Sequence, residues 1–306
     1  MKLTRREFAF SLSAAALAAT TPAPRVAITM DDFRWRGIPG NDPKKANRAL
    51  LDTLAKHSNL KAALFACGIN VDQPAGRQLL QSWSDAGHII GNHTYSHPSY
   101  NSPKVTAASF GEDLLHCEEV LKGFASFQKI LRFPFLKEGN TAAKRDEMRA
   151  FLTAHGYRIG HVTIDASDWY FDQRLHAHLE KDPGFDTSRY SEPYLEHMLD
   201  RATYYDTLAR DLLGAPIPHT ILVHYNLLNV LFLGDLLTMF EKKGWQLISA
   251  QSAFQDEVFK RKPNIVPAGE SLIWALAKES GRFEAKLRYP GESDEYEKAK
   301  LDRLGL

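Results

Sequence analysis

The stretch RVAITMDD, residues 25–32, is a short run of apolar residues that ends in two aspartates. Such a run predicts a buried β-strand whose polar residues lie at its C-terminal end. Similar strand-like runs return along the chain, and several of them also end in polar residues. They lie at 61–68, 88–94, 129–135, 158–169, 219–226 and 245–250.

Segments with apolar residues at helical spacing separate these runs, at 44–59, 76–87, 104–124 and 227–244. Strands that alternate with helices imply parallel βαβ units, and the fold class expected is therefore α/β. In a (β/α) barrel the active site forms at the face where the C-terminal ends of the strands meet. The polar strand ends are accordingly the candidates for function.

The composition is that of an ordinary soluble globular protein, with 306 residues, 44% hydrophobic and 25% charged. A formal net charge of +1 without a basic block gives no electrostatic footprint for nucleic acid. Cys67 and Cys117 both stand among apolar residues. We interpret them as buried small hydrophobic residues, and a disulfide between them is the less favoured alternative.

The N-terminal stretch MKLTRREFAFSLSAAALAATTPAP has a basic start, an Ala-rich apolar run and small residues near its end. This layout predicts a signal peptide over residues 1–23, and TRREF at 4–8 resembles the twin-arginine export signal. An ordinary Sec signal and an uncleaved helix are the alternatives. We expect an exported protein, periplasmic or extracellular, without stable membrane insertion after cleavage, because the apolar run is too short for a span.

The rest of the chain divides into a barrel domain at 24–255 and a C-terminal extension at 256–306. Residues 171–218 form a long, mostly helical excursion within the barrel, and DPGFDTSRYSEPY at 182–194 is expected to be a loop. The extension contains an apolar segment at 270–279, which we expect to be a helix packed on the barrel exterior.

Two histidines four residues apart, His93 and His97, can point to the same side and bind one common object, such as a metal ion. Two imidazoles and one carboxylate are a common ligand set for catalytic zinc and leave one position open for water. Residue 94 is threonine, so the HExxH pattern is absent and the general base must lie elsewhere. Asp31 and Asp32 can supply one ligand and one base.

Three further polar groups follow other predicted strands. Each has an ordinary structural explanation when taken alone, namely an ion pair on the rim, a capping turn or a core histidine. Together with the aspartate pair and the histidine pair they make five polar groups at one face of a barrel, and such a set favours a catalytic site instead. The three groups are Arg132 in LRFPF, Asp165 with Asp168 and Trp169 in IDASDW, and His224 in ILVH.

The ordered motifs TMDD, HTYSH, RFPF, DASDW and LVH resemble those of the NodB-homology polysaccharide deacetylases, carbohydrate esterase family four. The resemblance covers residues 25–250 and implies a distorted (β/α) barrel of about seven strands. It also implies a role for each matching position. Asp31 would be the general base held by Arg132, and Asp32, His93 and His97 the metal ligands. His224 would be the general acid tuned by Asp168, Phe135 would contribute its amide to the oxyanion site, and Trp169 with Leu222 would line the acetyl pocket.

The chain departs from the family pattern at Met30, Phe33, Phe135 and Tyr225, where Phe, Gly, Tyr and Asp are the usual residues. None of these positions is a proposed metal ligand. Phe33 and Tyr225 bear on the shape of the substrate groove rather than on the chemistry.

The resemblance implies a metal-dependent deacetylase acting on an acetylated polysaccharide or oligosaccharide. An N-acetylated glycan such as peptidoglycan or chitin is the leading substrate class. An O-acetyl esterase acting on xylan, an amidohydrolase of small non-sugar substrates and a non-catalytic glycan-binding barrel are the alternatives. One divalent ion is expected, Zn²⁺ before Co²⁺, Ni²⁺ or Fe²⁺, since two imidazoles and a carboxylate suit each of them.

Overall fold

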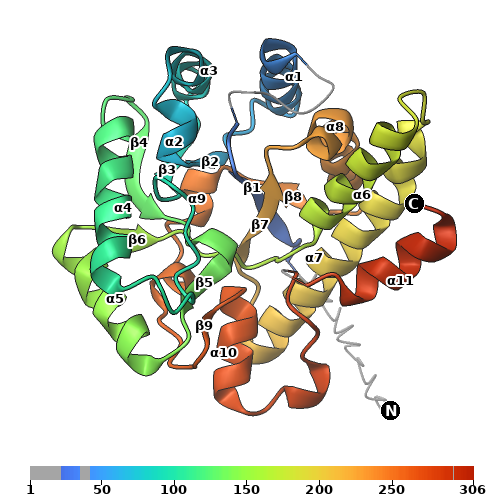
Figure 1. Cartoon of the computed structure of the whole chain (residues 1–306). Coiled ribbons are helices and arrows are strands. Elements are labelled where there is room, and N and C mark those ends of the chain that lie inside the picture. The colour runs from blue at the N-terminus through green and yellow to red at the C-terminus, as the bar shows by residue number, and fades with distance from the viewer. Residues whose placement is uncertain (1–21, 35–41, 292) are drawn as a thin grey trace, which may run out of the picture.

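The computed structural model describes residues 22–34, 42–291 and 293–306. Its centre is a parallel sheet of seven strands (Figure 1). Six of them follow the order β6-β4-β3-β2-β1-β7, and the seventh, β8, pairs with β1. The α/β class and the curled sheet of about seven strands are therefore confirmed. The strands are β1 Arg25–Asp31, β2 Ala63–Ala66, β3 Ile89–Asn92, β4 Phe127–Leu131, β6 Arg158–Ile159, β7 Pro218–His224 and β8 Gln246–Leu247.

One segment of chain connects the two edges of this curled sheet. It begins as β6, where Ile159 pairs with Leu131 of β4. It ends at Ile164, which forms a parallel bridge with Ile221 of β7. The predicted strand at 158–169 is thus wrong in its length, because the chain pairs with one edge and then crosses to the other. Helix α6 already begins at Asp168.

Helices surround the sheet, and most of them begin at a side chain that caps free backbone amides. Asp42 accepts from the amide of Lys45 at α1, and Asn226 accepts from the amide of Asn229 at α8. The main helices are α1 Pro43–Lys56, α2 Gly68–Val71, α3 Pro74–Asp85, α4 Ala107–Leu121, α5 Ala142–Ala154, α6 Asp168–Lys181, α7 Ser191–Leu213, α8 Leu227–Lys242, α9 Ala250–Ala253, α10 Leu272–Ser280 and α11 Glu295–Leu304.

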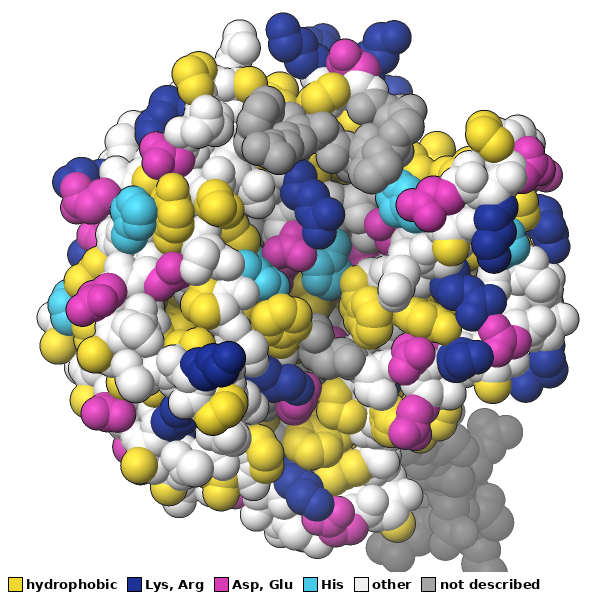
Figure 2. Space-filling model, viewed as in Figure 1, with side chains coloured by type: hydrophobic (Ala, Val, Ile, Leu, Met, Phe, Trp, Pro, Cys, Tyr) yellow, Lys and Arg dark blue, Asp and Glu magenta, His cyan; other side chains and the backbone are white. Residues whose placement is uncertain are grey.

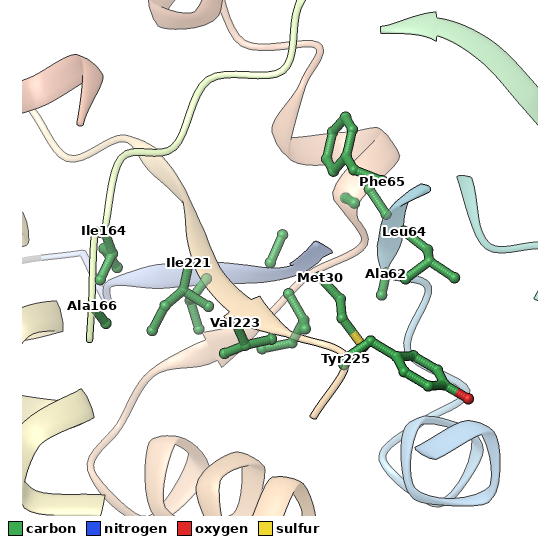
Figure 3. Packing of buried hydrophobic residues seen from close by; sticks show 14 of the residues in the cluster. Met30, Ala62, Leu64, Phe65, Ile164, Ala166, Ile221, Val223 and Tyr225 are labelled. Carbon is green, nitrogen blue, oxygen red and sulfur yellow. The ribbon is translucent and has the colours of Figure 1, made fainter. Parts of the chain in front are cut away.

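The core lies between the sheet and these helices. Met30 of β1, Leu64 of β2 and Val223 of β7 are fully buried and lie close together in Figure 3. Strands covered on both faces carry continuous apolar runs, as β1 and β7 do. Cys67 and Cys117 are both buried and form no disulfide, as expected, and Cys117 belongs to the hydrophobic core.

The excursion at 171–218 consists of α6, a 3₁₀ turn at Thr187–Tyr190 and the long helix α7. The loop expected at 182–194 is therefore too long, because α7 already begins at Ser191. None of the helices within the described ranges has the length and apolarity needed to cross a membrane. The signal peptide expected at 1–23 lies almost wholly outside the described residues.

The chain beyond residue 255 packs against two earlier segments of the chain. β9, Ala268–Gly269, pairs antiparallel with β5, Lys137–Gly139. At the start of α10, the amide of Leu272 donates to the carbonyl of Val162 at 2.7 Å, and Ser271 Oγ donates to the carbonyl of Thr163 at 2.8 Å. These contacts join the C-terminal extension to the segment that connects the sheet edges.

Candidate active site

The C-terminal ends of the central strands surround a cavity of about 490 Å³. Figure 2 shows histidine, acidic and hydrophobic side chains around a hollow in the middle of this face. The strand-end rule explains the location, because parallel strands place the residues that follow them at one edge. Of the residues predicted from the sequence, those lining the cavity are Asp32, His93, His97, Phe135, Trp169 and His224.

Asp31 is the last residue of β1 and forms a buried ion pair behind the cavity. Arg132, which follows β4 and is 1% exposed, donates through Nη1 to both carboxylate oxygens at 2.9 and 3.0 Å. Its other nitrogens are also bound, Nε to the carbonyl of Gly160 and Nη2 to Oγ1 of Thr29. Burial raises the pKa of Asp31, and Arg132 offsets this only in part.

His93 and His97 both lie close to one carboxylate oxygen of Asp32. Oδ1 of Asp32 lies 3.6 Å from Nε2 of His93 and 3.4 Å from Nε2 of His97. Asp32 directly follows β1 and His93 directly follows β3, so two strand ends bring the carboxylate and one imidazole together. His97 reaches the same oxygen through the turn that Thr94 stabilises by accepting from the His97 amide at 3.1 Å.

The state of these imidazoles suits metal binding. Nδ1 of His93 lies 2.8 Å from the carbonyl of Arg132. Since a carbonyl only accepts, Nδ1 carries the proton and the Nε2 lone pair faces Asp32. Burial lowers the pKa of both His93 and His97 to about 4, so both rings are neutral near pH 7. A carboxylate and two neutral imidazoles fit a divalent ion such as Zn²⁺.

His224 ends β7 and is held by Asp168, the first residue of α6. Nδ1 of His224 lies 2.6 Å from Oδ1 of Asp168, and the His224 amide donates to Oδ2 at 2.8 Å. Asn229 donates to the same Oδ2 at 2.8 Å. Burial lowers the pKa of His224, but the Asp168 carboxylate, together with smaller contributions from Asp32 and Asp31, raises it overall to about 10. His224 therefore carries a proton at neutral pH.

Backbone strain gathers at this site. Asp32, His97 and Phe135 have positive φ angles of 62°, 59° and 56°. Residues with a side chain rarely adopt this conformation, and it persists where surrounding contacts fix the chain. The ring of Phe135 packs edge-on against His97 at 4.7 Å and is 44% exposed, so it also borders the cavity.

Two residues singled out from the sequence lie away from the cavity wall. Leu222 is 1% exposed and packs with Leu136 and Val162 instead of lining the cavity. Asp165 is fully buried and accepts from the amide of Gly291 at 2.7 Å, so it contacts the C-terminal extension.

A model of the polysaccharide deacetylase family matches residues 18–159, which include the two aspartates, both histidines and Arg132. Over these residues the chain belongs to this family. It is 30% identical over 145 residues to the peptidoglycan-N-acetylglucosamine deacetylase of Bacillus cereus, a match that covers 47% of this chain and 46% of that protein. It is 27% identical over 158 residues to the chitin deacetylase of Colletotrichum lindemuthianum, covering 50% and 56%.

The chain spans about half the length of the two curated polysaccharide deacetylases that it matches. Among solved structures, a pseudoenzyme of carbohydrate esterase family four from Bacillus anthracis superposes with a TM-score of 0.52 at 17% identity, covering 77% of this chain and 66% of that one. This likeness shows the fold alone. Because a pseudoenzyme has the fold, catalysis has to be argued from the side chains.

Two departures from the polysaccharide deacetylase pattern compensate each other. Phe33 and Tyr225 are both buried, and their rings meet edge-on at 5.2 Å. The Tyr225 hydroxyl donates to Oδ1 of Asn47 at 3.1 Å. The two substitutions therefore fill one volume together at the ends of β1 and β7.

Several residues of the site were not predicted from the sequence. Asp172, Gln173 and His176 line the cavity from the same face of α6 as the predicted Trp169, and this helical spacing is a signal that was available. Cys67 was interpreted only as a core residue. Its Sγ, with ligand atoms of Asp32 and His93, belongs to a group in which all atoms lie within 4.8 Å of one another. Arg34, Tyr225 and Asn226 complete the cavity wall.

Proposed function

We propose that this protein is a metal-dependent N-deacetylase that releases acetate from an N-acetylated glycan of the peptidoglycan or chitin type. The supporting observation is the placement of two paired groups around one set of ligand atoms. Asp31, paired with Arg132, and His224, paired with Asp168, occupy directly paired positions on β1 and β7. The ligand atoms of Asp32, His93 and His97 lie beside them.

A divalent ion held by Asp32, His93 and His97 would activate water and stabilise negative charge on the acetyl oxygen. Asp31 is placed to accept the proton of the attacking water, since Oδ2 lies 3.9 Å from Nε2 of the proposed ligand His93. Arg132 fixes both Asp31 oxygens and thereby holds the base in one orientation. The amide of Phe135 is proposed as a further donor to the oxyanion.

His224 is proposed as the general acid. Its pKa of about 10 means that the ring is protonated at neutral pH and can give a proton to the departing amine. Asp168 binds Nδ1, so Nε2 is the atom left to act. Trp169 borders the cavity and offers an apolar wall for the acetyl methyl group. Leu222 is too deeply packed to share that role without movement.

The substrate class is proposed from the two curated relatives, whose names describe deacetylases of peptidoglycan N-acetylglucosamine and of chitin. Export is proposed from the sequence of residues 1–23, with the twin-arginine route favoured by TRREF. A glycan substrate outside the cytoplasm is consistent with both. Zn²⁺ is the proposed metal because the donor set is two nitrogens and one oxygen.

The experiment that tests this function is acetate release by the Zn²⁺-loaded protein. An N-acetylglucosamine oligomer and an acetylated xylan are offered in parallel, with Asp31→Asn as the blank. Release from the oligomer is expected. Release from the xylan alone would identify an O-acetyl esterase, and silence on both with metal bound would contradict a glycan deacetylase and favour a binding function.

A further inference from the structure

We propose that Cys67 is an additional ligand of the metal in this site. The inference rests on the metal binding proposed above and adds a thiolate to a ligand set of one carboxylate and two imidazoles. Cys67 directly follows β2, the strand between β1 and β3. Asp32 follows β1 and His93 follows β3 in the same way. Three neighbouring strands therefore each deliver one potential ligand to the same edge of the sheet.

The distances agree with this placement. Sγ of Cys67, a carboxylate oxygen of Asp32 and a ring nitrogen of His93 all lie within 4.8 Å of one another. The Cys67 side chain is buried, with 3% of its surface exposed, and Sγ lies 3.6 Å from the carbonyl of His93. His93 is 2% exposed, and Asp32 Oδ1, the nearest charged atom to its Nε2, lies beyond hydrogen-bond distance at 3.6 Å. Nε2 of this buried imidazole thus faces the Asp32 carboxylate without a hydrogen bond, and a ring nitrogen of His93 lies within 4.8 Å of the Cys67 sulfur.

The backbone fixes Cys67 in this position. The amide of His93 donates to the carbonyl of Ala66 at 3.2 Å, and the amide of Gly68 donates to the carbonyl of Thr94 at 3.0 Å. These bonds hold the residues on either side of Cys67 against the chain that carries His93. A Cβ on Gly68 would lie 2.5 Å from the ring of Tyr95 and 3.2 Å from Cα of Cys117, so the turn after Cys67 is closely packed.

The chemistry of a thiol matches the metal proposed for the site. Zn²⁺ accepts sulfur, nitrogen and oxygen donors, whereas Mg²⁺ and Mn²⁺ prefer oxygen. When the metal binds, the S–H bond of Cys67 breaks, a sulfur–metal bond forms and the proton passes to solvent. A sulfur donor would therefore raise the preference for Zn²⁺ and Co²⁺ over oxygen-seeking ions. It would also make metal retention sensitive to oxidation of Cys67.

The other cysteine provides a matched control. Cys117 is also fully buried, and its Sγ lies 3.5 Å from the carbonyl of Ala66, immediately before Cys67. It belongs to no group of potential metal ligands within the described residues. Cys67→Ser and Cys117→Ser thus make the same atomic change at two buried positions, of which only the first faces Asp32 and His93.

The test is titration of the metal-free full-length protein with Co²⁺, followed by near-ultraviolet absorption. Coordination by thiolate produces an intense sulfur-to-cobalt charge-transfer band, which nitrogen and oxygen ligands do not. The wild type and Cys117→Ser are expected to develop the band. Cys67→Ser is expected to bind Co²⁺ without it and to lose at least about tenfold in Zn²⁺ affinity, measured by competition with a chelator.

The possible outcomes distinguish the role of Cys67 from the presence of the metal site. Wild-type protein that binds Co²⁺ without the band would overturn the assignment of Cys67, and this outcome does not depend on whether any variant folds. An unchanged band in Cys67→Ser would overturn it as well. Protein that binds no Co²⁺ would overturn both this inference and the metal site, whereas acetate release without the band would remove Cys67 alone.

Discussion

The pair formed by His224 and Asp168 gives a prediction whose size follows from the structure. Asp168 is fully buried and accepts four hydrogen bonds, from Nδ1 and the amide of His224 and from the side chains of Asn226 and Asn229. Substitution of Asp168 by Asn keeps the shape and removes the charge. The charged His224 ring then loses the carboxylate that compensates for its burial.

The expected effect on the pKa of His224 is a fall. Burial lowers this pKa and Asp168 is the largest influence that raises it, with the result of about 10. A carboxylate at hydrogen-bond distance typically shifts the pKa of its partner by roughly one to three units. If His224 is the general acid, it must be protonated to act. The alkaline limb of kcat/KM should therefore move to lower pH by roughly one to three units in Asp168→Asn.

The same shift predicts a change in stability of the metal-free protein. His224 has a higher pKa folded than unfolded, so its contribution is fully present below pH 6.5 and is lost as the pH rises through about 10. The difference between these pKa values corresponds to on the order of 5 kcal/mol. Between pH 6.5 and about 10, the free energy of unfolding should fall more steeply in the wild type than in Asp168→Asn. At the acid end of this range, Asp168→Asn should be the less stable of the two proteins.

The assay is urea unfolding at both ends of that interval, together with the pH profile of acetate release. Asp172→Asn is the matched control, because Asp172 lines the same cavity but its charged neighbour is His176, at 3.4 Å, rather than His224. An alkaline limb that stays in place in Asp168→Asn would refute the assignment of His224 as the acid. Equal pH dependence of unfolding in wild type and Asp168→Asn would refute the electrostatic argument itself.

Two further predictions concern the base and the C-terminal extension. Asp31→Asn should retain metal and lose about 100- to 10,000-fold in kcat, whereas His93→Ala should lose both metal and turnover, as measured by metal content and acetate release. Near-normal rates in Asp31→Asn would show that the base is another group. Gly291→Ala should destabilise the protein by about 1 to 3 kcal/mol in thermal unfolding, because its Cβ would lie 2.6 Å from Asp165 Oδ1 and 2.7 Å from the Ala166 amide nitrogen. Gly123→Ala, which has open space around the new carbon and no positive φ, should be near neutral, and equal melting temperatures would contradict the packing argument.

The strand-end rule explains why much of the site could be predicted from the sequence. Asp31, His93, Arg132 and His224 each end or directly follow a strand of the parallel sheet. The direction of the strands is enough to bring such residues together, whatever the details of packing. No distance between them follows from the sequence, but their common location does.

A local sequence pattern does not encode how deep a residue lies along its strand or where a segment crosses the sheet. Leu222 shares a strand face with His224, yet it lies two residues earlier and therefore about 7 Å deeper along β7. At that depth Leu136 and Val162 cover it. The strand expected at 158–169 is short because its chain leaves β4 to reach β7, and this depends on the closure of the whole sheet.

The C-terminal extension shows a second limit of prediction from the sequence. Its contribution to the site depends on contacts between residues more than 100 positions apart. The carbonyl of Gly291 accepts from Nε1 of Trp169 at 2.8 Å and from Oγ of Ser167 at 3.0 Å. It thus holds the two residues that flank Asp168, while the Gly291 amide binds Asp165. The residue that tunes His224 is therefore positioned by a segment outside the part of the chain that matches the family model. A sequence comparison limited to the matching part would leave out contacts on which the orientation of the proposed acid depends.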